Sequence, residues 1–292
     1  MDRTSRITVG DVELFVREIG PDKPPAPPLV VIHGGPSWDH SYLLPGLLPV
    51  SSRRHVVAFD LRGCGRSSRD LGPDAYQPEL VVEDLARLIR TLGHEHVDVI
   101  GFSTGGQVAQ LFVEAYPRLV RRLVLASTTA YSDIALHLRG WEEYERRVAT
   151  APSPVDGLDN LATTMRWAIH GATTAIWNLD LLHEYLTLLD QVRFSGDWLE
   201  PFRAGRLHPW RPQDPERVLG DLDRPILILH GAQDMVFTVQ LALRLHEAVP
   251  GSQLQVIEQS GHMAQFEQPE RWSKAVIDFL TRECPSEPGE PR

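Results

Sequence analysis

The stretch from His96 to Pro117 sets a serine between an apolar run and a helical pattern. Val97 to Ile100 is a short run rich in β-branched residues, which is typical of a strand buried in a parallel sheet. After Ser103, apolar residues recur at helical spacing, at Val108, Leu111, Phe112 and Ala115, until Pro117. The chain must therefore turn sharply at Ser103, which predicts a strand, a tight turn and a helix in succession.

Glycines on both sides of the serine make such a turn possible. Gly101 and Gly105 have no β-carbon, so strand and helix can approach closely while Ser103 adopts a strained conformation with its hydroxyl projecting. Gly101-Phe102-Ser103-Thr104-Gly105 matches the G-x-S-x-G pattern of a nucleophile elbow. Glycine and serine are common, so the pentapeptide alone fits an ordinary strand-to-helix turn equally well. Other parts of the sequence are therefore needed to distinguish a nucleophile elbow from an ordinary turn.

Short apolar runs alternate with helix-period segments along most of the chain. Strands are predicted at Ile7 to Val9, Val12 to Glu18, Leu29 to Ile32, His55 to Phe59, Val97 to Ile100, Leu123 to Ala126, Ile226 to Leu229 and Leu254 to Ile257. A helix is predicted from Pro78 to Gly93, with Val81, Leu85 and Leu88 on one face. The alternation predicts an α/β fold with a mostly parallel central sheet covered by helices on both faces.

The alternation is interrupted between Tyr131 and Leu222, where no convincing buried strand occurs. Helical patterns occur around Trp141 to Val148, Thr163 to Ile169 and Leu179 to Val192. We therefore expect a helical cap of residues 131–222, inserted after the sixth strand into a core of residues 1–130 and 223–283. The Pro- and Glu-rich residues 284–292 are expected to form a disordered tail.

Aromatic residues gather in the expected cap, which contains five of the seven tryptophans. Pockets at domain junctions are mostly apolar and aromatic, so some of these side chains are expected to contact a bulky, largely nonpolar substrate. The substrate-binding candidates are Trp38, Trp141, Trp167 and Trp177. The alternative for each is packing of the cap onto the core.

Two further polar residues follow predicted strands and complete a catalytic constellation with Ser103. Asp234 follows the strand from Ile226 to Leu229, and His262 follows the strand from Leu254 to Ile257. Because the carboxyl ends of parallel strands meet at one edge of the sheet, the three side chains are expected to gather there. The order serine, aspartate, histidine is that of a nucleophile, an orienting acid and a base. A turn-forming Asp234 and a surface His262 are the alternatives.

The segment His33-Gly34-Gly35-Pro36 follows another predicted strand and supplies a candidate oxyanion hole. Gly35 is the expected donor of one backbone N–H, since Pro36 has no N–H. The N–H of Thr104, at the start of the helix after Ser103, is the expected second donor. A plain loop at His33 to Pro36 is the alternative.

These motifs, with Asp60-Leu61-Arg62-Gly63-Cys64-Gly65-Arg66-Ser67, resemble those of α/β-hydrolases over about Ile7 to Leu280. Within that superfamily, His33 to Pro36 and Asp60 to Ser67 are similar to proline iminopeptidases. Thr104-Gly105-Gly106 after the serine instead resembles cofactor-free esterases and perhydrolase-like haloperoxidases. The resemblance implies a serine hydrolase acting through an acyl-enzyme.

Three functions are consistent with this resemblance. The expected one is hydrolysis of a carboxylic ester or lactone with a bulky apolar portion. A prolyl aminopeptidase is the alternative, and it would need a carboxylate for the substrate's ammonium group. Candidates for that carboxylate are Glu142, Glu143, Glu145 and Glu184, whose alternative role is a solvated helix face. A ligand-binding protein without catalysis is the lesser alternative.

Charge and composition exclude other classes of function. A net charge of −10 disfavours binding to nucleic acids and to anionic membranes, which leaves a small-molecule substrate as the expected partner. The sequence shows neither a run of about 18 apolar residues nor a signal peptide, so a cytoplasmic location is expected. Cys64 and Cys284 are far apart and H-E-x-x-H is absent, so neither a metal nor another cofactor is expected. The oligomeric state is not predicted.

Overall fold

The computed structural model describes residues 1–22, 26–150 and 157–282. In this part of the chain one eight-stranded sheet has the order β1-β2-β4-β3-β5-β6-β7-β8. The strands are β1 (Asp2–Val9), β2 (Val12–Ile19), β3 (Leu29–Ile32), β4 (Val56–Phe59), β5 (Val97–Phe102), β6 (Val120–Ala126), β7 (Ile226–Gly231) and β8 (Gln253–Ile257). Strand β2 is antiparallel to β1 and β4, and neighbours from β4 to β8 run parallel. The predicted mostly parallel sheet is confirmed.

Helices cover both faces of the sheet because alternate strand residues point to opposite sides. Val30 and Ile32 of β3 pack with one core cluster, while Leu29 and Val31 pack with the other. The first cluster includes α2 (Pro78–Thr91), α3 (Thr104–Ala115), α10 (Pro215–Gly220) and α11 (Val239–Ala248). The second includes α1 (Leu44–Ser51), α12 (Ala264–Glu267) and α13 (Pro269–Thr281). Short 3-10 helices are η1 (His40–Leu43), η2 (Pro73–Ala75) and η3 (Pro117–Leu119).

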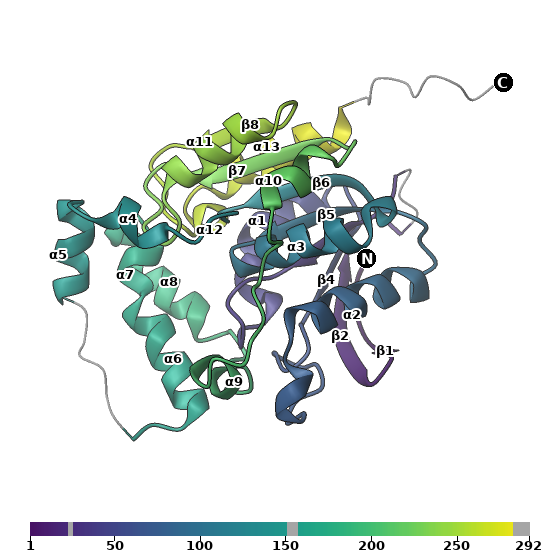
Figure 1. Cartoon of the computed structure of the whole chain (residues 1–292), viewed down its shortest axis with the longest axis horizontal. Helices are drawn as coiled ribbons and strands as arrows, with labels where there is room; N and C mark the ends of the chain where they lie inside the picture. Colours follow the sequence, from purple (N-terminus) through teal and green to yellow (C-terminus); the bar gives the residue numbers. More distant parts are fainter. Residues whose placement is uncertain (23–25, 151–156, 283–292) are drawn as a thin grey trace.

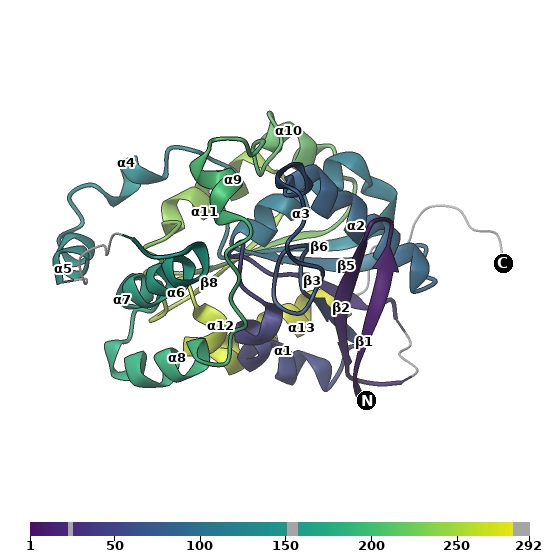
Figure 2. The same cartoon turned by 90° about the horizontal axis from the view of Figure 1, so that it is seen from below.

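Residues 127–225, between β6 and β7, are called the insert below. Before α10 they form α4 (Ile134–Leu138), α5 (Glu142–Thr150), α6 (Asn160–His170), α7 (Ala172–Ala175), η4 (Leu179–Leu181), α8 (Leu182–Leu189) and α9 (Leu199–Arg203). The described residues of the insert contain no strand. Figures 1 and 2 both show α5 to α8 gathered on one side, away from β1 and β2. A separate cap with boundaries at 131 and 222 stays a prediction, and 284–292 lie outside the described residues.

The insert is bonded to loops that follow the strands. The Ser195 N–H donates to the Ser37 carbonyl over 2.8 Å, and the Trp198 indole N–H donates to the Arg62 carbonyl over 2.8 Å. On the other side, the Met263 N–H donates to the Ala175 carbonyl over 3.0 Å. The insert therefore lies against the edge of the sheet at which the sequence predicts the site.

Strand β1 is longer than the apolar pattern indicates. It begins at Asp2 instead of Ile7, and all of its residues from Asp2 to Arg6 are exposed. An edge strand needs no apolar face. Side-chain ion pairs also link β1 to β2, such as that of Arg3 with Glu18 at 2.9 Å. None of the helices in the described part of the chain is long and apolar enough to cross a bilayer.

Candidate active site

Ser103 occupies a tight turn between β5 and α3, as the glycine pattern predicts. Its φ of 55° and ψ of −125° lie in a region that residues with a β-carbon rarely adopt. The turn is held by the Ser103 N–H, which donates to the Ala126 carbonyl over 3.0 Å, and by the Thr128 hydroxyl, which donates to the Ser103 carbonyl over 2.6 Å. The surrounding sheet therefore holds Ser103 in this strained conformation.

Helix α3 starts so close to β3 that Gly105 has no room for a side chain. A Cβ there would lie 2.2 Å from the Ile32 carbonyl oxygen and 2.5 Å from that of His33. We expect Gly105→Ala to lower the free energy of unfolding by about 1–3 kcal/mol or more, as measured by urea denaturation. Gly220→Ala is the control, because a Cβ on this helical glycine meets nothing within 4 Å. An unchanged urea midpoint in Gly105→Ala would contradict the close packing.

The three predicted catalytic side chains are in contact. His262 Nε2 lies 3.0 Å from Ser103 Oγ, and His262 Nδ1 lies 2.8 Å from Asp234 Oδ2. All three are buried, and the Phe102 and Phe237 rings pack against the imidazole at centroid distances of 5.2 and 5.6 Å. The structure thus brings together, from three separate strand ends, side chains in the arrangement that a nucleophile, a base and an orienting acid would need.

Asp234 is held in its ionised form. Burial alone raises its pKa, but the facing imidazoles of His262 and His230, with their hydrogen bonds, lower that pKa far below the usual value. The other oxygen, Oδ1, accepts the N–H groups of Val236 (2.7 Å) and Phe237 (2.8 Å). Because an ionised carboxylate only accepts, the proton of a neutral His262 lies on Nδ1, and Nε2 is free to accept the Ser103 proton.

The two predicted oxyanion donors lie beside Ser103. Gly35 shares a pocket lining with Ser103, and its N–H donates to no other group in the described residues. Thr104 is the first residue of α3, so its N–H has no helical acceptor. The neighbouring Gly34 N–H donates to Tyr42 Oη over 2.8 Å, which fixes the loop. Tyr42 was not among the residues predicted from the sequence.

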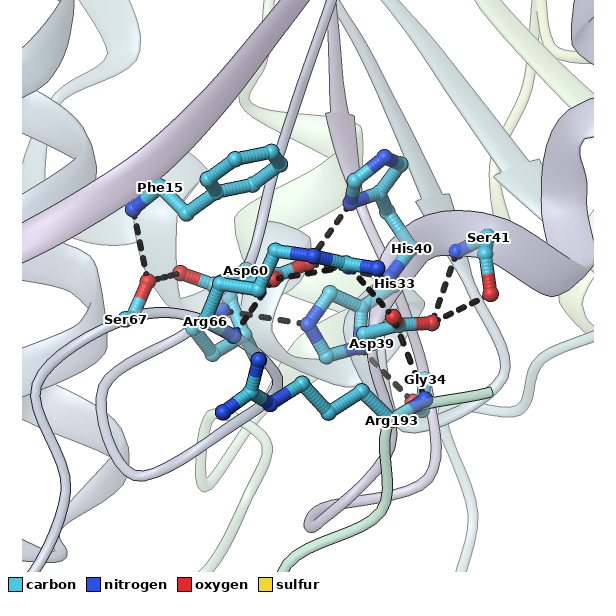
Figure 3. A network of polar contacts seen from close by, with 11 residues as sticks. Phe15, His33, Gly34, Asp39, His40, Ser41, Asp60, Arg66, Ser67 and Arg193 are labelled. Atoms are coloured by element: carbon cyan, nitrogen blue, oxygen red, sulfur yellow. Dashed lines mark hydrogen bonds and ion pairs between the residues drawn. The ribbon is translucent and has the colours of Figure 1, made fainter. Parts of the chain in front are cut away.

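Beneath this loop, His33 bridges two backbone segments (Figure 3). Its Nδ1 lies 2.9 Å from the Gly34 carbonyl, and its Nε2 lies 3.1 Å from the Leu61 N–H. Because Nε2 must accept from Leu61, the proton lies on Nδ1 and donates to Gly34. Complete burial lowers the pKa of His33, which favours this neutral form. His33 therefore orients the loop from His33 to Pro36, called the glycine loop below, without carrying charge.

Two buried carboxylates complete the network of Figure 3. Asp60 accepts from His40 Nδ1 over 2.6 Å and from the Arg66 N–H over 2.8 Å. Asp39 accepts from the Arg66 guanidinium over 2.9 Å and from the Arg193 N–H of the insert over 3.2 Å. The network joins the glycine loop, the Asp60–Ser67 segment and the insert.

We expect the contribution of Asp60 to stability to depend on pH. Burial raises the pKa of Asp60, but His40, His33 and the Arg66 N–H outweigh it and hold this pKa below its usual 3.8. Ionised Asp60 therefore stabilises the fold at pH values above this usual pKa. The stabilisation is lost as the pH falls through the lowered pKa of the folded state. Asp60→Asn should be destabilised by about 1–3 kcal/mol near pH 7, with a smaller difference from wild type below about pH 3.5.

Urea denaturation across this pH range measures the effect. Asp223→Asn, at an exposed position, is the control and should follow the wild type at every pH. A gap between Asp60→Asn and wild type that stays constant from about pH 7 down to about pH 2 would contradict the role given to the ionised form.

A pocket of about 190 Å³ lies next to Ser103. It is lined by Gly35, Trp38, Tyr42, Phe102, Ser103, Trp167, Ala168, Gly171, Thr174, Ala175, Tyr185, Val236, His262 and Met263. Among these described residues there is no aspartate, glutamate, lysine or arginine. The tyrosines come from η1 and α8, and only the packing of the insert brings Tyr185 to this place. Within residues 1–22, 26–150 and 157–282, no cluster of three or more metal-ligating side chains is found.

Two of the four predicted substrate-binding tryptophans line this pocket, and two do not. Trp38 and Trp167 are in the lining, and Trp167 is 49% exposed. Trp177 instead lines a separate cavity of about 570 Å³, where the Arg147 guanidinium lies 5.0 Å from its ring centroid. This cation–π contact turns the indole toward α5. Trp141, just before α5, lines neither cavity. Trp141 and Trp177 are thus not part of the pocket beside Ser103, and a substrate contact for either one stays a prediction.

A mostly parallel sheet that brings a serine, a histidine and an ionised aspartate together at its strand ends defines a protein of the α/β-hydrolase class. Comparison with family models agrees with this class: residues 27–269 match the model described as alpha/beta hydrolase fold. The chain belongs to this family.

Named relatives in the family act on different substrates. The chain is 27% identical over 296 residues to 2-hydroxy-6-oxo-2,4-heptadienoate hydrolase of Pseudomonas putida, covering 95% of this chain and 96% of the relative. It is 27% identical over 289 residues to the proline iminopeptidase of Levilactobacillus brevis, covering 92% and 93%. A thermophilic esterase from Thermogutta terrifontis has the same fold, with a TM-score of 0.71, 23% identity and coverage of 95% and 98%. These similarities indicate a hydrolase without fixing its substrate.

Proposed function

We propose that this protein is a serine hydrolase that cleaves an uncharged carboxylic ester or lactone with a large apolar portion. The observation that carries the proposal is the pocket beside Ser103, whose described lining has no charged side chain. A charged group of a substrate would lose its hydration there without gaining a partner, which is costly. The apolar lining suits an uncharged acyl group.

The proposed reaction uses each residue of the site. His262 Nε2 takes the proton of Ser103, whose Oγ attacks the carbonyl carbon, and the N–H groups of Gly35 and Thr104 stabilise the resulting oxyanion. His262 then protonates the leaving alkoxide, which leaves an acyl-enzyme. Water, deprotonated by His262, attacks this ester, and the acid is released as the proton returns to Ser103. Asp234 holds the imidazole and stabilises its protonated form.

The pocket disfavours the activities of two of the named relatives, the proline iminopeptidase and the heptadienoate hydrolase. A prolyl aminopeptidase needs a carboxylate for the substrate's ammonium group, yet the candidate glutamates 142, 143, 145 and 184 are absent from the lining. Glu143 is already paired with Arg146 and Arg147. A dienoate carries a carboxylate, and no arginine or lysine among the described lining residues is present to bind it. A ligand-binding role without catalysis would leave the contact between Ser103 and His262 unexplained.

The experiment is a comparison of matched substrates on purified protein. Neutral aryl esters and lactones should be hydrolysed with a kcat/KM about 10²-fold or more above that of analogues bearing an ammonium or carboxylate on the acyl part, since an unpaired buried charge costs several kcal/mol. A prolyl-arylamide should not be cleaved. Preferred cleavage of the prolyl-arylamide would establish the aminopeptidase alternative instead.

We expect Trp167 to contact the apolar portion of large substrates. The pocket is smaller than the roughly 300–1,000 Å³ of common ligand sites, so a large substrate must extend past the exposed Trp167 at its mouth. Trp167→Ala should raise KM about tenfold for a long-chain or polycyclic ester and leave the KM of a small acetate ester unchanged. Trp141→Ala is the matched control, and an equal effect in both variants would argue against this contact.

A further inference from the structure

The carboxylate of Glu267 lies behind the loop of His262. Glu267 is the last residue of α12 and is only 8% exposed. Its Oε2 accepts the Gly261 N–H over 2.6 Å, and its Oε1 accepts the N–H groups of Trp177 and Asn178, both over 2.8 Å. Gly261 directly precedes His262, whereas Trp177 and Asn178 belong to the insert. One side chain thus joins the histidine loop to the insert.

The two joined segments also touch directly. A Cβ on Gly261 would lie 2.9 Å from the Trp177 nitrogen and 3.0 Å from the Ala175 carbonyl oxygen. Met263, on the other side of His262, donates its N–H to that same carbonyl over 3.0 Å. Ala175 also forms part of the pocket wall. Both neighbours of His262 are therefore fixed to a segment that contacts the substrate pocket.

Arg147 of α5 binds the carbonyl groups of the same segment of the insert, which extends from Thr173 to Asn178. Its guanidinium donates to the carbonyls of Thr173 (2.7 Å), Ile176 (2.7 Å) and Trp177 (2.9 Å). Glu267 accepts the N–H groups of this segment, so a cation and an anion bind opposite ends of its peptide dipoles. The position of the segment is consequently determined by both charges.

An ionised carboxylate fits this position better than any neutral side chain of its size. Three N–H donors point at its two oxygens, and none of the described cationic side chains bonds to it. An amide would present an NH₂ group, which cannot accept, to at least one of these donors. Burial raises the pKa of Glu267, while these three N–H bonds and the nearby Arg147 guanidinium act against that rise.

We propose that Glu267 is a positioning residue for His262. It fixes the histidine loop to the pocket wall at Ala175, and in doing so it keeps Nε2 within hydrogen-bond distance of Ser103 Oγ while substrate occupies the pocket. The proposal rests on the proposed function, because it assigns Glu267 a role in the same proton transfer. It also couples the insert to the catalytic base, so that the insert affects the chemical step and not only substrate binding.

The first test is Glu267→Gln, with Glu270→Gln at an exposed position of α13 as control. A displacement of about 1 Å at a reacting group can cost about 10²-fold in rate, so we expect kcat for a small neutral ester to fall 10- to 100-fold. KM should change by less than about threefold, because the pocket lining is retained. The rate at which a small fluorophosphonate labels Ser103 should fall by the same factor as kcat.

The second test removes a single N–H. Asn178 has a φ of −81°, which proline can adopt, so Asn178→Pro deletes the N–H that donates to Glu267. Asn178→Ala is its control, since it removes the side-chain contact with the Asp180 N–H and keeps the backbone donor. We expect kcat to be lower in the proline variant than in the alanine variant. Combined with Glu267→Gln, the proline substitution should lower kcat by less than the product of the two single effects.

The outcomes separate this inference from the proposed function. Wild-type turnover that disappears in Ser103→Ala, with unchanged kcat in folded Glu267→Gln and equal kcat in the two Asn178 variants, would overturn the positioning role alone. If Glu267→Gln does not fold, the comparison of the Asn178 variants decides. Absence of any turnover or Ser103 labelling in the wild type would instead overturn the proposed function, and the positioning role with it.

Discussion

Ser103→Ala is expected to lower kcat for the best neutral ester by at least about 10⁴-fold, because the covalent route through the acyl-enzyme is lost. The remaining rate would come from the oxyanion donors and the pocket, which the substitution leaves in place. Ser103 is only 8% exposed and its backbone is held by Ala126 and Thr128, so the variant should keep its fold. Steady-state hydrolysis measures kcat, and a fluorophosphonate probe reports the loss of the nucleophile.

Ser52→Ala provides the matched control, because this serine is exposed and lies outside the pocket. It should retain both turnover and probe labelling. Hydrolysis that persists in Ser103→Ala at more than about a hundredth of the wild-type rate would remove Ser103 from the role of nucleophile. A wild-type protein that binds esters without cleaving them or reacting with the probe would support the ligand-binding alternative.

The strands and the elbow could be predicted because short-range patterns determine them. The β-branched run of β3 and its neighbours must be buried on both faces, and Gly101 is required by its contact with the following helix. Gly105 matches the local pattern too, although the structure shows that the carbonyls of Ile32 and His33 are what exclude a side chain there. The order of the candidate residues along the chain also predicted that His262 and Asp234 lie with Ser103, and the structure brings the three side chains into contact. The polar start of β1 was missed, because an edge strand carries no apolar signal.

The pocket could not be predicted in the same way. Tyr42 and Tyr185 lie far apart in the sequence, and the packing of the insert against the sheet decides that both line the pocket. The place of an indole likewise depends on its neighbours. Trp177 packs against the Arg147 guanidinium and lines the separate cavity, while Trp167 lines the pocket beside Ser103. Glu267 follows His262 by five residues, yet its role depends on N–H groups of the insert, and no local pattern indicates them.

Asp234→Asn is expected to lower kcat by about 10⁴-fold near neutral pH, because it reverses the tautomer of His262. The N–H groups of Val236 and Phe237 both donate to Oδ1, so the amide oxygen of an asparagine must take that place. Its NH₂ group then faces His262 Nδ1, which has to accept, and the imidazole proton moves to Nε2. In that form His262 presents a hydrogen to Ser103 Oγ and cannot take its proton.

The same substitution separates orientation from mere packing. Asparagine has nearly the size of aspartate, so the pocket, KM and the rings around His262 should change little, and the loss should fall on kcat and on the rate of probe labelling. Asp74→Asn, at an exposed position of η2, should match the wild type. A kcat within about tenfold of wild type in Asp234→Asn would show that the His262 tautomer is set by another group, and His230, whose Nε2 lies 3.2 Å from Asp234 Oδ2, would be the next residue to replace.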